Sequence, residues 1–138
     1  MTAATATSDV EITFPANEAL VTLARFTAAT VATHAGFDIE EVEDLRLAVD
    51  ELCAAVGAFG DGSSIRVSFG RRGEAVMVRC VSEPSPDGPS DAGGVADDWR
   101  PSELSEQLIG ALVDRYGFER HLGRPCGWLE KTRGQAAG

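Results

Sequence analysis

Residues 38–59 read DIEEVEDLRLAVDELCAAVGAF and form the longest helical pattern in the chain. Asp38 and Glu41 have the spacing of a capping box, which predicts that a helix begins here. Gly57 and Gly60 predict where it ends. Apolar residues recur at intervals of three and four, which keeps them on one helix face: Val42, Leu45, Val49, Leu52, Val56 and Phe59. The sequence therefore predicts a long amphipathic helix against which the rest of the fold packs.

Glu51 is the unusual residue of this helix, because it lies off the apolar face and has no charged partner at helical spacing. The residues three and four positions away are Leu47, Ala48, Ala54 and Ala55. Asp50, in contrast, has Arg46 four positions earlier and is interpreted as half of a surface ion pair. A carboxylate on an apolar flank is either part of a functional cleft or an exposed glutamate on a tolerant helix. Glu51 is the candidate site residue, and both interpretations stay open.

The charge of the chain limits its partners. The 138 residues suit a single domain, and 22 acidic against 12 basic residues give a formal net charge of −10. Nucleic-acid binding requires a basic face to neutralise phosphates, so DNA or RNA is not expected as a direct partner. Anionic membrane surfaces are disfavoured for the same reason. Without a leader-like or membrane-spanning apolar segment, the protein is expected in the cytoplasm.

The three cysteines do not suggest a metal site. Cys53, Cys80 and Cys126 are an odd number without metal-ligand spacing. Cys53 and Cys80 fall inside apolar patterns, so they are expected as small core residues.

The remaining elements alternate between strands and helices. A strand is expected over residues 10–14, a helix from Asn17 to His34, a β-hairpin over 65–80, a helix from Ser102 to Gly117, and strands over 118–122 and 128–132. The inward positions of the two shorter helices are expected to be Leu20, Leu23, Ala24, Thr27 and Val31 in the first, and Leu104, Leu108 and Leu112 in the second. Turns are expected at residues 71–73 and 123–125.

This order predicts an α+β two-layer sandwich, with a mixed, mostly antiparallel sheet of about five strands and three helices on one face. Residues 8–133 are expected to form a single domain, with loose termini at 1–7 and 134–138. Residues 82–101 contain four prolines, three glycines and several aspartates. This composition predicts a flexible, lid-like loop.

The string DLRLAVDELCAAV, residues 44–56, resembles the second helix of the small anti-sigma factors of the RsbW type. Those proteins have the histidine-kinase-like (GHKL) ATPase fold, and the resemblance in element order extends over about residues 8–133. It implies ATP and Mg²⁺ as cofactors, with a catalytic glutamate at Glu51 that polarises the attacking hydroxyl or water. Four residues later the family has a metal-binding asparagine, where this chain has Ala55.

The other nucleotide motifs implied by the resemblance are degenerate. The adenine-binding aspartate of the family falls in residues 81–84, VSEP, where Glu83 beside Ser82 is a substitute and Asp87-Gly88 a second choice. The phosphate-binding turn falls at residues 101–105, PSELS, which contain no glycine and carry a glutamate that repels phosphate. We therefore expect weak or absent ATP binding, with no metal ligand.

Three functions remain open. The resemblance implies a regulator that binds a sigma factor, a STAS-domain anti-anti-sigma factor, or both, as a homodimer. Its candidate surface is the outer face of the first helix, with Glu18, Thr22, Arg25 and Thr33. The alternative is an active ATP-dependent serine/threonine kinase that phosphorylates a STAS-domain partner, with Glu51 as the base. A third interpretation is a dimeric sheet protein with no link to nucleotides.

Overall fold

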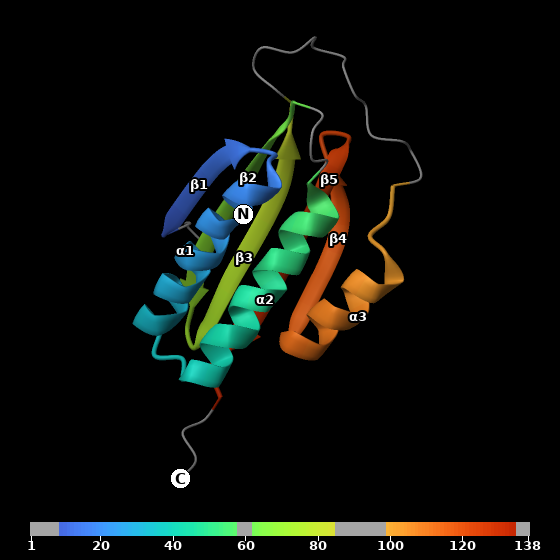
Figure 1. Cartoon of the computed structure of the whole chain (residues 1–138). Helices are drawn as coiled ribbons and strands as arrows, with labels where there is room; N and C mark the ends of the chain where they lie inside the picture. Colours follow the sequence, from blue (N-terminus) through green and yellow to red (C-terminus); the bar gives the residue numbers. More distant parts are fainter. Residues whose placement is uncertain (1–8, 58–61, 85–98, 135–138) are drawn as a thin grey trace, which may run out of the picture.

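The fold is a five-stranded sheet with helices on one face, as the computed structural model describes it for residues 9–57, 62–84 and 99–134 (Figure 1). The strand order is β1-β2-β3-β5-β4, and every neighbouring pair is antiparallel. The elements are β1 (Val10–Pro15), the 3-10 helix η1 (Glu18–Leu20), α1 (Val21–His34), α2 (Ile39–Val56), β2 (Ser64–Arg72), β3 (Ala75–Glu83), α3 (Glu103–Leu112), β4 (Arg115–His121) and β5 (Arg124–Thr132). The predicted α+β sandwich is confirmed, although the sheet is antiparallel rather than mixed.

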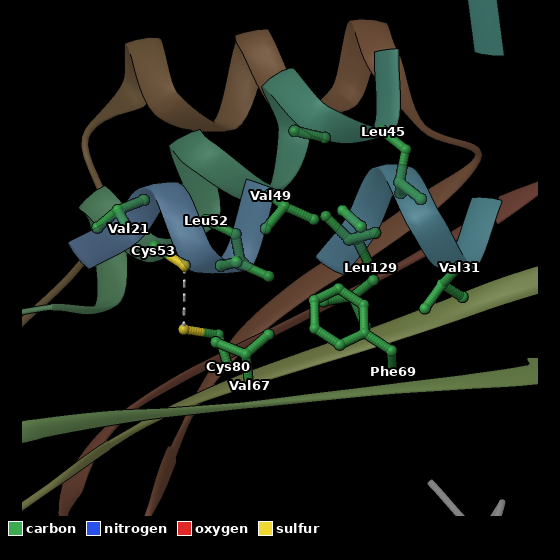
Figure 2. Close-up of a cluster of buried hydrophobic side chains, with 14 of the residues drawn as sticks. Val21, Val31, Leu45, Val49, Leu52, Cys53, Val67, Phe69, Cys80 and Leu129 are labelled. Atoms are coloured by element: carbon green, nitrogen blue, oxygen red, sulfur yellow. Dashed lines mark hydrogen bonds between the residues drawn. The ribbon is translucent and has the colours of Figure 1, made fainter. Parts of the chain in front are cut away.

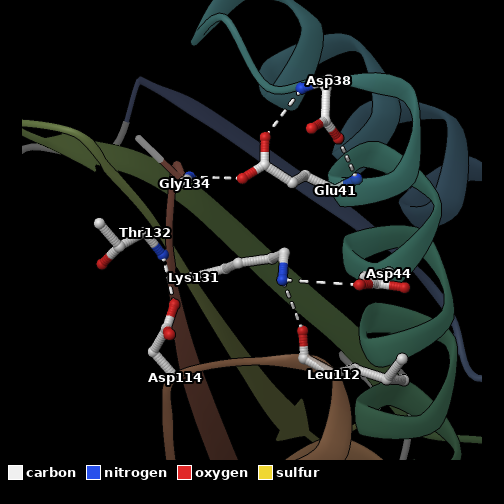
Figure 3. A network of polar contacts seen from close by, with 8 residues as sticks. All are labelled: Asp38, Glu41, Asp44, Leu112, Asp114, Lys131, Thr132 and Gly134. Carbon is white, nitrogen blue, oxygen red and sulfur yellow. Dashed lines mark hydrogen bonds and ion pairs between the residues drawn. The ribbon is translucent and has the colours of Figure 1, made fainter. Parts of the chain in front are cut away.

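Helix α2 begins at the predicted capping box. The backbone N–H of Glu41 donates to Asp38 Oδ1 at 2.7 Å, and the N–H of Asp38 donates to Glu41 Oε1 at 2.9 Å (Figure 3). Glu41 Oε2 also accepts a hydrogen bond from the N–H of Gly134, which attaches the end of the chain to the start of α2. The helix ends before Gly57, as predicted. Gly60 lies outside the described residues.

The predicted apolar face of α2 is the centre of the core. Side chains from α1 and α2 point towards the sheet residues Val67, Phe69 and Leu129 (Figure 2). Four predicted positions of α2 are almost completely buried: Leu45, Val49, Leu52 and Val56. Val42 is partly buried at the margin of the core, and Phe59 lies outside the described residues.

The cysteines are free and buried, which confirms the prediction that Cys53 and Cys80 are core residues. Cys80 Sγ, on β3, lies 3.9 Å from Cys53 Sγ, on α2, and donates to it (Figure 2). This hydrogen bond, together with burial, raises the pKa of the Cys80 thiol well above its ordinary value. Burial likewise raises the pKa of Cys126.

The inward faces of the two shorter helices differ from prediction. In α1 the buried residues are Val21, Ala24, Ala28, Val31 and Ala32. The predicted inward residue Leu23 is 48% exposed. In α3 the fully buried residue is Ile109, and Leu104 and Leu108 are exposed. Ser105 and Ile109 occupy the side of α3 that faces α2 and the core, and this orientation turns the two leucines towards solvent.

The last hairpin also differs from prediction. Leu122 and Gly123 have φ values of 54° and 80°, so the chain reverses through these two residues and β5 begins at Arg124. Pro125 therefore lies in a strand rather than in the turn. Its missing N–H is tolerated because the pairing of β3 with β5 stops at Val81 and Cys126. β4 begins at Arg115, where a helix to Gly117 was predicted.

Candidate functional site

Glu51 is half-buried on the side of α2 that faces α3. Its Oε2 atom accepts a hydrogen bond from Ser105 Oγ at 3.2 Å. Ser105 Oγ in turn accepts from Ser102 Oγ at 3.0 Å, and the backbone N–H of Ser105 donates to the same Ser102 oxygen at 3.0 Å. The predicted site carboxylate is thus the end of a chain of two hydroxyls from the first turn of α3. Sequence reasoning missed this partner, because Ser105 is 54 residues away in the chain.

The segment that leads into α3 packs on the sheet through an aromatic contact. The ring of Trp99, three residues before Ser102, meets the ring of Phe118 on β4 edge-on, with centroids 6.1 Å apart. Phe118 meets Tyr116 in the same way at 6.2 Å. Such edge-to-face pairs stabilise a defined geometry. They place the segment that precedes α3 against β4.

The metal position of the family motif has no ligand. Ala55 lies one turn after Glu51 on the same flank of α2 and is half-buried. Its methyl group offers no oxygen to a hard cation such as Mg²⁺. Across residues 9–57, 62–84 and 99–134, no group of three or more His, Cys, Asp or Glu side chains is arranged to hold a metal ion.

The end of β3 carries the predicted adenine-binding stretch, and its side chains are already engaged. Ser82 is buried, and Arg124 donates to it twice, from Nη2 to Oγ at 3.0 Å and from Nε to the carbonyl oxygen at 3.2 Å. Glu83 forms an ion pair with Arg66 at 3.2 Å. The strand runs to Glu83, so both residues belong to β3 rather than to the loop predicted from residue 82. Asp87 and Gly88 lie outside the described residues.

Arg124 is a site residue that sequence reasoning missed. It was assigned to a turn before Pro125, whereas it begins β5 and is 9% exposed. A buried guanidinium requires hydrogen-bond acceptors, and the Ser82 oxygens supply two of these bonds.

The start of α3 is poorly suited to phosphate. A helix N-terminus attracts anions through its free backbone N–H groups, but the Ser102 hydroxyl already accepts from the N–H of Ser105. Glu103 and Glu106 place two carboxylates in this first turn. No glycine stands between residues 99 and 109 to bring the backbone close to a phosphate. The described residues therefore do not fit a bound Mg²⁺–ATP.

Comparison with known proteins agrees with this architecture. The model of the histidine kinase-like ATPase domain matches residues 14–128, and the chain belongs to this family. It is also 26% identical over 127 residues to the serine-protein kinase RsbW of Halalkalibacterium halodurans, an alignment that covers 83% of this chain and 77% of that protein. The predicted RsbW-type resemblance is confirmed, and the interpretation as a sheet protein unrelated to nucleotide-binding folds is set aside.

None of the helices in the described part of the chain combines the length and the apolar character that crossing a membrane requires.

Proposed function

We propose that this protein is a regulator of the RsbW type, which acts by binding a sigma factor, a STAS-domain antagonist, or both, and which binds ATP weakly or not at all. The observation that carries the proposal is the set of neighbours around Glu51. The carboxylate of the family motif is present, but its neighbours are Ser105 and Ala55 rather than a metal ligand and a phosphate-binding turn.

The charges around Glu51 disfavour a bound triphosphate. Phosphoryl transfer depends on positioning and on neutralising the phosphate charge, with little covalent chemistry for the protein to supply. Glu51, Glu103 and Glu106 add negative charge around the start of α3. The basic group beside the end of β3, Arg124 of β5, is already hydrogen-bonded to Ser82. Because Ala55 supplies no metal ligand, the negative charge of a bound triphosphate would be poorly neutralised.

The surface for a partner includes the outer face of α1, but its residues differ in part from those predicted from the sequence. Arg25 donates to Thr22 Oγ1 at 3.1 Å and forms an ion pair with Asp50 of α2 at 3.3 Å. These two predicted surface residues are thus engaged in contacts along α1 and with α2. Glu18 and Thr33 are exposed as predicted, and Leu23 and Phe26, the latter 61% exposed, are further outward residues.

Three threonines make this outer face more apolar than its sequence suggests. The hydroxyls of Thr27, Thr30 and Thr33 donate to backbone carbonyls one turn earlier, those of Leu23, Phe26 and Ala29. With their hydroxyls bonded to the helix itself, their methyl groups are available for contact. An apolar stripe of this kind is suited to packing against a partner, which supports a binding function.

The second candidate is an active serine/threonine kinase for a STAS-domain partner. The observation that favours it is the Glu51–Ser105 hydrogen bond, because it shows that the carboxylate is oriented to accept from a serine hydroxyl. The named relative is itself described as a serine-protein kinase. In this reading a partner's serine would replace Ser105 beside Glu51.

One experiment separates the two candidates. The protein is used to capture partners from extract of its native cells, and the captured proteins are then incubated with labelled ATP and Mg²⁺. The regulator proposal expects a sigma factor or a STAS-domain protein among the partners, without phosphorylation. Phosphorylation that Glu51→Ala abolishes, with the partner still bound, would instead establish the kinase.

The proposal places the protein in the cytoplasm as a homodimer, with no direct contact to nucleic acid or membrane. Sedimentation of the purified protein at several concentrations tests the homodimer. A mass that stays that of one chain over the whole range would contradict it.

A further inference from the structure

The acidic and basic residues behind the net charge of −10 are distributed unevenly between the helices and the sheet. Helices α2 and α3 carry eight carboxylates and one basic residue, Arg46, which leaves a formal charge of −7. The five strands carry eight basic and four acidic residues, which leaves +4. The helical layer therefore carries most of the negative charge and attracts a cationic partner.

Three exposed leucines lie within this acidic layer. Leu47 of α2 is 52% exposed, and Leu104 and Leu108 of α3 are 64% and 41% exposed. We refer to Leu47, Leu104 and Leu108 as the leucine patch. Large apolar side chains on a helix surface are unremarkable when scattered singly, but a group of them on adjacent helices marks a binding surface.

The contacts between α2 and α3 place these leucines together. Near one end of the helix pair, Ser105 donates to Glu51 at 3.2 Å. Near the other, Lys131 Nζ donates to the Leu112 carbonyl at 2.8 Å and lies 3.8 Å from Asp44 Oδ2 (Figure 3). The two helices therefore run antiparallel, side by side (Figure 1). The turn between these two contacts carries Leu47 on α2 and Leu108 on α3, with Leu104 one turn before Leu108.

We propose that the leucine patch binds a cationic amphipathic segment of a partner protein, with apolar side chains on the leucines and Lys or Arg over the surrounding carboxylates. This deepens the proposed regulator function by assigning a surface and a partner chemistry to it. Glu51 on α2 lies one turn after Leu47, and Glu103 on α3 directly precedes Leu104. Glu43 and Asp50, one turn to either side of Leu47, form ion pairs with Arg46 and Arg25. The stripe on α1 has no carboxylate of its own within residues 21–34, so a cationic segment favours the patch.

The charges argue against two other occupants. A second copy of this chain would bring two acidic α2–α3 layers into contact, and like charges at an interface oppose association. Residues 85–98 of the same chain contain four aspartates and no basic residue, so they do not supply the complementary charge. An anionic membrane is repelled in the same way.

The test uses a fluorescein-labelled synthetic peptide, with leucines on one helical face and lysines on the others, titrated at physiological ionic strength. A peptide with glutamate in place of lysine is the charge control. Leu47→Ser and Leu108→Ser are the test variants, and Leu122→Ser, at a position 90% exposed in the β4–β5 turn, is the matched control. Hydrogen exchange with and without peptide reports which helix becomes protected.

Saturable binding of the lysine peptide is expected, with α2 and α3 protected. Each test variant is expected to weaken binding about tenfold, because each removes a leucine that the peptide buries. Leu122→Ser is expected to leave the affinity unchanged. No saturable binding, equal loss in all three variants, or protection of α1 with loss in Leu23→Ser would overturn the proposal. So would a concentration-dependent dimer that Leu108→Ser dissociates, since the occupant would then be a second copy.

A capture experiment tests the leucine patch and the regulator function separately. A native sigma factor or STAS-domain protein captured equally by the wild type and by the Leu47→Ser/Leu108→Ser double variant would leave the regulator function standing and overturn the patch. Peptide binding as described, with neither partner captured from native extract, would support the patch and contradict the regulator function.

Discussion

Ser105 Oγ donates a hydrogen bond to Glu51 Oε2 at 3.2 Å, and this contact joins α3 to α2 at the position of the family's catalytic carboxylate. The proposed site carboxylate is bonded to the protein's own serine. Opening the site to a phosphate or to a partner's hydroxyl requires this bond to break. The contact is therefore both a tertiary link between two helices and a competitor of any ligand at Glu51.

The first prediction concerns the energy of this contact. In a double-mutant cycle of Glu51→Ala and Ser105→Ala, we expect a coupling of about 0.5–1 kcal/mol in the free energy of unfolding, measured by urea denaturation. The control cycle pairs Glu51→Ala with Glu106→Ala, for which the two changes should add. Additive effects in the Glu51–Ser105 cycle would show that the bond contributes nothing in solution.

A second prediction concerns Lys131, whose side chain is 12% exposed between β5 and the helices. Lys131→Met keeps the aliphatic length but leaves the Leu112 carbonyl without this donor and Asp44 without its ion pair. We expect a loss of about 1–2 kcal/mol in the free energy of unfolding, because the amine hydrogen-bonds in a partly buried site. Arg115→Met is the control. The Arg115 side chain is 67% exposed, so its ion pair with Glu130 should contribute little.

The fold was predictable because its decisive signals are local. The capping box at Asp38 and Glu41 and the apolar face of α2 both depend on residues close together in the sequence, and the structure confirms both. The inward face of α3 was not predictable, because Leu104 and Leu108 have a helical spacing that also suits a core. What turns them outward is the contact between Ser105 and Glu51, and no local pattern encodes it.

In the candidate site, too, the local features were predictable from the sequence and the long-range contacts were not. Glu51 was identified from its own helix, whereas its partner Ser105 lies beyond the long loop. Arg124 was missed because a glycine, an arginine and a proline in succession are typical of a turn. The actual turn falls at Leu122 and Gly123, since a leucine there adopts positive φ, which sequence patterns rarely predict.

A third prediction follows from the buried thiol of Cys80. Its pKa is raised above the ordinary value of 9.0, so the folded state favours the protonated thiol. The stability that this provides is complete below pH 9.0 and is lost as the pH rises through the higher folded-state value. Cys80→Val should therefore show a smaller decline in the free energy of unfolding above that pH than the wild type. Identical alkaline declines in the two proteins would contradict this assignment.

A fourth prediction restores the missing metal ligand. Ala55→Asn supplies an amide oxygen one turn after Glu51, on the flank where the family carries its asparagine. We expect this variant to bind a fluorescent ATP analogue more tightly with Mg²⁺ than without it, because the new oxygen is a ligand suited to that cation. Ala54→Asn, at the neighbouring exposed position, is the matched control and should show no gain. An equal gain in both variants would mean that the position of the amide is irrelevant.

The central claim is that this family member regulates by protein contact and has lost its nucleotide site. The most direct test is a titration of the wild-type protein with a fluorescent ATP analogue in the presence of Mg²⁺. We expect no saturable binding in the micromolar range. Ala55 supplies no metal ligand, Glu103 adds negative charge, and Glu51 is bonded to Ser105, so the phosphate charge is not neutralised. Saturable micromolar binding that unlabelled ATP displaces would contradict it.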